Sequence, residues 1–134
     1  MPTTDPAYLN KLYLLALCVW REARGESTHG KALVAQVIRN RVESPGWPDT
    51  YVGVITQPWQ FSAFNRNDPN ATRYPADADP SWRDSVRAAE LVLTGEQPLT
   101  TANHYVVGTL YPQPSWADPT KITIREGAHV FYTL

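Results

Sequence analysis

Glu22 stands at the end of an apolar helical pattern, where a carboxyl group can act as a general acid. Positions 15, 18, 19 and 22 are three and four residues apart, so Glu22 continues the stripe of Leu15, Cys18 and Val19. A carboxyl group at the edge of an apolar stripe is partly desolvated, and desolvation raises its pKa. Glycoside cleavage needs such a carboxylic acid, still protonated near neutral pH. The plainer alternative is a surface glutamate paired with a neighbouring arginine.

A second carboxylate, Glu26, follows four residues later, beyond Gly25. The dipole of a helix that starts at this point would lower the pKa of Glu26. A lowered pKa makes Glu26 a poorer acid and favours a structural or substrate-binding role. Two carboxylates in different environments can also form an acid–base pair, and the sequence leaves this alternative open.

Other kinds of reactive site have weaker support. The three histidines, His29, His104 and His129, do not have the paired spacing of a metal site, although dispersed histidines can converge on zinc. Cys18 is the only cysteine, so no disulfide forms within the chain, and a cysteine on a buried stripe is usually inert. The sequence contains no phosphate-binding or dinucleotide-binding motif. We therefore expect neither a metal nor a cofactor.

The length and composition predict one domain spanning residues 1–134. A net charge of −1 argues against nucleic acid as a partner. Five tryptophans and seven tyrosines suit a groove for pyranose rings, although many of these aromatics will fill the core. The apolar stretch from Leu12 to Trp20 is too short to span a bilayer, and neither a basic segment nor a cleavage site flanks it. We expect a soluble monomer without a signal peptide or stable membrane insertion.

Periodicity and capping signals predict a mainly helical α+β domain with a small antiparallel sheet near the C-terminus. Three helices are expected, each with a polar cap or a proline at its start. A long polar and aromatic loop should separate the second helix from the third, after one short turn of helix or strand. The predicted helices span Pro6 to about Gly25, Ser27 to Val42 and Pro80 to Gly95, the short turn is Val52 to Ile55, the loop spans Thr56 to Asp79, and the strands are Ala102 to Val107, Ile122 to Ile124 and His129 to Thr133.

The order of several motifs resembles the cell-wall hydrolase family of the spore-cortex-lytic enzyme SleB. The motifs are EARGE (22–26), GKALVAQVIRNRV (30–42), VITQPWQFS (54–62), ANHY (102–105), PSWA (114–117) and GAHVFY (127–132). The family resembles lytic transglycosylases and goose-type lysozymes in fold, which implies a lysozyme-like helical core with a glycan-binding groove. The resemblance covers nearly the whole chain. Ala63 departs from the family pattern, since a bulkier residue or cysteine is expected there.

The resemblance implies that Glu22 is the catalytic residue and that peptidoglycan glycan strands are the substrate. Glu22 would protonate the glycosidic oxygen between N-acetylmuramic acid and N-acetylglucosamine and then act as a base. If it activates the muramoyl C6 hydroxyl, the chain is a lytic transglycosylase, which we favour; if it or Glu26 activates water, the chain is a muramidase. The candidates for substrate binding, for most of which core packing is an equal alternative, are Glu26, Gln60, Phe61, Ser62, His104, Tyr105 and Trp116.

Two other classes of function remain as alternatives: a zinc amidase that cuts the peptide stem, and a non-catalytic glycan-binding module. Several arginines have an open role, because they can meet substrate carboxylates or pair within the fold; these are Arg24, Arg39 and Arg41, with the structural role favoured for Arg41. Without an added peptidoglycan-binding domain, the chain resembles a stand-alone phage endolysin. Such an enzyme is made in the host cytoplasm and acts on the cell wall after release.

Overall fold

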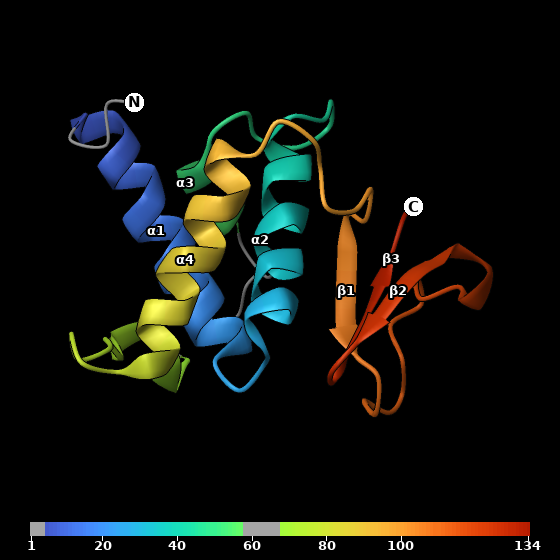
Figure 1. The fold of residues 1–134 in the computed structure, drawn as a ribbon. Helices are drawn as coiled ribbons and strands as arrows, with labels where there is room; N and C mark the ends of the chain where they lie inside the picture. Colours follow the sequence, from blue (N-terminus) through green and yellow to red (C-terminus); the bar gives the residue numbers. More distant parts are fainter. Residues whose placement is uncertain (1–4, 58–67) are drawn as a thin grey trace.

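The computed structural model describes residues 5–57 and 68–134 of the chain. The described part combines a layer of helices with a small sheet beside them (Figure 1). Its elements, in chain order, are α1 (Pro6–Ala23), α2 (Thr28–Val42), α3 (Tyr51–Ile55), the 3-10 turn η2 (Pro69–Thr72), α4 (Pro80–Thr94), β1 (His104–Val107), the 3-10 turn η3 (Pro119–Lys121), β2 (Ile122–Glu126) and β3 (His129–Tyr132). The predicted mainly helical α+β class is confirmed.

Local capping explains where the long helices begin. The side chains of Asp5, Ser27 and Asp79 accept hydrogen bonds from backbone N–H groups in the first turns of α1, α2 and α4. Proline occupies the first position of α1 and of α4, where its fixed φ suits the helix and its missing N–H costs nothing. The predicted starts of all three helices are therefore confirmed.

The three helices pack around a shared apolar core. In α1, every residue from Leu15 to Arg21 is buried. α4 crosses in front of α1 and α2 and contributes small side chains, such as Ala88 and Ala89, that allow close approach (Figure 1). The largest fully buried apolar side chains of this core include Leu15, Leu33, Ile38, Ile55 and Phe131.

The sheet has the strand order β1-β3-β2, and both pairs are antiparallel. The turn between β2 and β3 contains Gly127, whose φ of +57° lies in the left-handed region. Phe131 of β3 joins the core, so one face of the sheet packs toward the helices. Tyr105 and Phe131 are direct partners across β1 and β3, which places Tyr105 on that same face.

Polar side chains at the end of α2 attach the sheet to the helices. Asn40 Nδ2 donates to the carbonyl oxygens of Thr100 and Ala102, at 2.9 and 2.8 Å. The buried Arg41 donates through Nε to the carbonyl oxygen of Asn103 at 2.8 Å. These bonds hold the segment that leads into β1, so the end of α2 determines where Tyr105 lies. The structural role favoured for Arg41 is thus seen directly.

Arg39 connects α2 to the end of α4. Its NH1 atom donates to the carbonyl oxygens of Val92 and Gly95, at 2.5 and 2.8 Å, and its Nε atom pairs with Glu43 at 3.2 Å. The carbonyl groups at a helix C-terminus lack partners within the helix, so a guanidinium group satisfies them well. Within the described residues, no helix is long and apolar enough to cross a membrane.

Candidate active site

Glu22 lies in the last turn of α1, where the helix approaches the sheet. It is partly buried between the buried residues Arg21 and Ala23. Cys18 and Val19, which precede it on the same stripe, have no exposed surface. The predicted placement of this carboxyl group at the edge of a buried stripe is therefore confirmed.

Tyr105 holds one oxygen of the Glu22 carboxyl group. Its hydroxyl group donates to Glu22 Oε1 at 3.0 Å. Burial, together with the negative charge of Glu22, raises the pKa of Tyr105 well above its usual value of about 10, so the hydroxyl group remains a donor. The same two causes raise the pKa of the Cys18 thiol. The chain thus brings a protonated tyrosine and a carboxyl group together in a partly desolvated setting.

The ring of Tyr105 is fixed by two aromatic neighbours from β3. The His129 ring meets it edge-on, with centroids 5.1 Å apart and an angle of 80° between the planes. The Phe131 ring lies at 5.8 Å from it. The prediction that Tyr105 belongs to the site is supported by its bond to Glu22, and its stacking on a sugar stays a prediction.

Glu26 points toward the sheet. Its side chain is 13% exposed, and Oε1 accepts a hydrogen bond from the Ala128 backbone N–H at 3.1 Å. The same oxygen lies 3.6 Å from Nδ1 of His129, which is 6% exposed. Burial lowers the pKa of His129, and the charge of Glu26 opposes this effect. The sequence did not indicate His129 as a site residue, because its proximity depends on the register of β3.

His104 and Trp116 meet in a second aromatic cluster. Their ring centroids lie 4.8 Å apart, and Trp47 and Tyr132 extend the cluster on either side. Since neighbouring residues of a strand point to opposite faces, His104 lies on the other side of the sheet from Tyr105. Burial lowers the pKa of His104, and the positive charge of Arg41 adds to the effect. Substrate binding by His104 and Trp116 stays a prediction.

The segment before α4 covers the other side of the α1 C-terminus. The Nε and NH2 atoms of Arg21 donate to the carbonyl oxygen of Arg73, at 3.1 and 3.0 Å, and its guanidinium group lies 5.0 Å from the centre of the Tyr74 ring. Trp20 donates through Nε1 to Asp79 at 3.2 Å. The exposed Tyr74 ring is thereby held next to the residue that precedes Glu22, a position that the sequence did not indicate.

Three candidate residues lie outside the described part of the chain. Gln60, Phe61 and Ser62 belong to the segment 58–67, so their predicted contacts with N-acetyl groups and sugar faces stay predictions. Among the residues that the structure does describe, no three histidine, cysteine, aspartate or glutamate side chains come together as a metal site.

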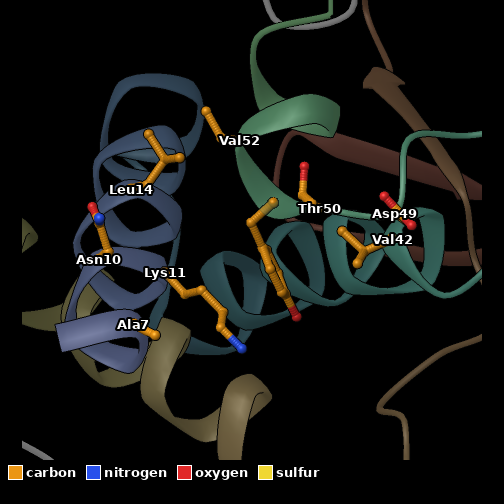
Figure 2. A pocket seen from close by; sticks show the side chains of 9 residues that line it. Ala7, Asn10, Lys11, Leu14, Val42, Asp49, Thr50 and Val52 are labelled. Atoms are coloured by element: carbon orange, nitrogen blue, oxygen red, sulfur yellow. The ribbon is translucent and has the colours of Figure 1, made fainter. Parts of the chain in front are cut away.

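A pocket of about 520 Å³ is lined by side chains that Figure 2 shows as sticks. Its lining includes Ala7, Asn10, Lys11 and Leu14 from the first half of α1, and Tyr51 from α3. Leu14 is eight residues from Glu22, which corresponds to about 12 Å along a helix. This pocket is therefore separate from the candidate active site.

Comparison with known proteins identifies the family. A family model described as Cell Wall Hydrolase matches residues 25–132. The chain belongs to the cell wall hydrolase family. The resemblance predicted from the order of the motifs is thus confirmed.

Named relatives of the chain are spore cortex-lytic enzymes. The chain is 42% identical to that of Halalkalibacterium halodurans over 123 residues, which make up 91% of this chain and 34% of the relative. It is 40% identical to that of Bacillus subtilis over 85 residues, which make up 59% of this chain and 28% of the relative. The matched regions therefore span only 28–34% of the length of these curated relatives.

Solved structures share the fold. The catalytic domain of the germination-specific lytic transglycosylase SleB from Bacillus anthracis is similar with a TM-score of 0.73 and 29% identity, covering 96% of this chain and 98% of that one. The catalytic domain of the Bacillus cereus SleB protein is similar with a TM-score of 0.74 and 30% identity, covering 92% and 90%. The likeness to SleB catalytic domains confirms the fold expected from the motifs.

Proposed function

We propose that this chain is a lytic transglycosylase that cleaves the β-1,4 bond between N-acetylmuramic acid and N-acetylglucosamine in peptidoglycan. The main support is the hydrogen bond of 3.0 Å from the Tyr105 hydroxyl group to Glu22 Oε1. It occurs in a chain that has the fold of SleB catalytic domains. A partly buried carboxyl group with a fixed orientation is what a general acid requires. Membership in the cell wall hydrolase family supports peptidoglycan as the substrate.

The hydrogen bond from Tyr105 distinguishes the two oxygens of the Glu22 carboxyl group. Because the Tyr105 hydroxyl group donates to Oε1, we assign the acidic proton to the other carboxyl oxygen, Oε2. Oε2 donates this proton to the glycosidic oxygen, and the bond from that oxygen to C1 of the muramoyl residue breaks. The charge that develops on C1 gives an oxocarbenium-like transition state.

In the second half of the reaction, Glu22 acts as a base. Its carboxylate takes the proton from the muramoyl C6 hydroxyl group while O6 forms a bond to C1. The products are a 1,6-anhydromuramoyl end and a free N-acetylglucosamine end, and Glu22 is protonated again. The cycle therefore requires one carboxyl group and neither water nor a nucleophilic residue.

Replacing Glu22 tests the identity of the acid. We expect Glu22→Gln to abolish the clearing of a cell-wall suspension while circular dichroism and Tm stay close to those of the wild type, because the amide cannot supply the proton. Glu96→Gln, at an exposed position, is the matched control and should clear the suspension normally. Clearing by Glu22→Gln would refute the proposal.

The product distinguishes a transglycosylase from a muramidase. Mass spectrometry of the released muropeptides should find muramoyl ends lighter by one water than hydrolysed ends. Reducing muramic acid ends would instead indicate hydrolysis. Full activity in EDTA is expected as well, and inhibition by EDTA would favour the zinc amidase.

We propose separately that the chain is a phage endolysin, which concerns how the enzyme reaches the cell wall. This proposal predicts that the chain, expressed inside a bacterium, lyses the cell only when a membrane-permeabilising holin is also present. Lysis without a holin would refute it.

A further inference from the structure

The second glutamate of the EARGE motif is anchored at both its backbone and its side chain. The Glu26 N–H donates to the carbonyl oxygen of Ala23 at 2.9 Å. Its own carbonyl oxygen accepts from Nζ of Lys31 at 2.6 Å, and Lys31 is only 2% exposed. The carboxylate then reaches the Ala128 N–H, 102 positions away in the chain. Glu26 therefore links the α1–α2 corner to the turn between β2 and β3.

The turn is built to lie directly on this carboxylate. A Cβ atom at Gly127 would lie 2.2 Å from Glu26 Oε1 and 3.0 Å from Cδ. Only glycine leaves room for the carboxylate at that point. Oε1 is thus enclosed by the turn backbone, the Ala128 N–H and the ring of His129.

A chain of contacts runs from this turn to Glu22. His129 follows Ala128 directly, and its ring packs edge-on against Tyr105, 5.1 Å away. The hydroxyl group of Tyr105 donates to Glu22 Oε1 at 3.0 Å. The position of the turn therefore influences where the Tyr105 hydroxyl group lies relative to the acid.

We infer that Glu26 is a positioning residue that holds the Gly127–Ala128 turn, so that His129 and Tyr105 orient the carboxyl group of Glu22. This inference rests on the proposed function of Glu22. Glu26 takes part neither in proton transfer nor in the activation of water. The turn requires a hydrogen-bond acceptor at the position of Oε1, and a negative charge on that group is not essential.

Replacement of Glu26 by Gln and by Ala separates positioning from catalysis. Gln keeps an acceptor at Oε1, so we expect Glu26→Gln to retain kcat within about threefold of the wild type. Ala removes the acceptor, and we expect kcat to fall about 10- to 100-fold with KM unchanged, because a small misplacement of a catalytic group has effects of that size. Glu96→Gln again serves as the exposed control.

A double-mutant cycle shows whether the effect passes through Tyr105. In a Tyr105→Phe background the hydroxyl group is already absent, so adding Glu26→Ala should lower kcat by less than threefold. Fully additive losses would show that Glu26 acts by another route. If Glu26→Gln were as inactive as Glu22→Gln, Glu26 would be catalytic and the inference would be wrong; full activity of Glu26→Ala would overturn it as well.

Hydrogen exchange tests the anchor without any reaction. The Ala128 amide should stay protected in Glu26→Gln and lose its protection in Glu26→Ala, whose Tm should fall by about 5–10 °C. If Glu26→Ala does not fold, retained Ala128 protection and retained kcat in Glu26→Gln support the inference, and loss of either refutes it. Activity of Glu22→Gln would instead refute the proposed function. Hydrogen exchange at the Ala128 amide would still show whether Glu26 holds the turn.

Discussion

Gly127 offers a quantitative test of the contact between Glu26 and the turn. Replacement of Gly127 by Ala lowers the free energy of unfolding in two ways. An L-residue at a φ of +57° costs about 1–2 kcal/mol. The added Cβ also occupies the place of Glu26 Oε1, 2.2 Å away, so the carboxylate must move and release the Ala128 N–H. A hydrogen bond to a charged group contributes about 1.5–3 kcal/mol, and the sum is about 3–5 kcal/mol.

Two other glycines separate these contributions. Gly46 has a φ of +93° and open space where its Cβ would lie, so Gly46→Ala carries the backbone cost alone. Gly25 has open space as well and no positive φ, so Gly25→Ala should leave stability nearly unchanged. We expect the free energy of unfolding to fall least in Gly25→Ala, more in Gly46→Ala and most in Gly127→Ala. The loss in Gly127→Ala should exceed that in Gly46→Ala by about 1.5–3 kcal/mol.

Urea denaturation followed by circular dichroism measures all three variants. Addition of Glu26→Ala to Gly127→Ala removes the steric conflict, so the double variant should be more stable than the sum of the single effects predicts. If Gly127→Ala lowers the free energy of unfolding no more than Gly46→Ala does, the carboxylate does not lie against the turn and Glu26 is not an anchor.

Three further predictions concern Tyr105, Cys18 and the two histidines of the sheet. Tyr105→Phe should lower kcat about 10-fold and move the alkaline limb of the pH profile to higher pH, since the Glu22 carboxylate loses a donor; an unchanged profile would contradict this. Cys18 is fully buried with a raised pKa, so it should react with thiol reagents only after unfolding, and rapid labelling of the native protein would contradict its placement. Burial lowers the pKa values of His104 and His129 from 6.5, so their contribution to stability is complete above about pH 6.5 and is lost as the pH falls through the lowered values. Urea denaturation should therefore give a lower free energy of unfolding at pH 5 than at pH 7.5. The same value at both pH values would refute this prediction.

Helix starts could be predicted from the sequence because capping is local. A capping side chain and the helix that it caps lie within three residues, as with Asp79 and Pro80. Burial was less predictable. Leu9 and Tyr13 are spaced three and four residues apart along the helix on the way to the buried Ala16, a spacing that predicts a shared buried face, but they are 44% and 49% exposed, so this prediction is wrong. Periodicity shows which residues share a face, whereas coverage of that face depends on elements distant in the chain.

The same distinction applies to the site. The position of Glu22 on a buried stripe could be predicted from spacing within one helix. The roles of His129 and Gly127 could not, because their contact with Glu26 spans about 100 residues and depends on how β3 pairs with β1. Gly127, between the last two predicted strands, was a signal for a tight turn, but it carried no information about which side chain the turn would cover.

The end of α1 separates the two glutamates. Glu22 and Glu26 are four residues apart, so in a continuous helix they would share one face and could form an acid–base pair. The helix ends at Ala23, however, and the chain turns so that the Glu26 N–H donates to the Ala23 carbonyl group. Glu26 then points to the Gly127–Ala128 turn, while Glu22 remains on the stripe of α1. A mechanism with a single carboxyl group, in which the substrate's own C6 hydroxyl group replaces water, needs only the glutamate that this helix end leaves at the site.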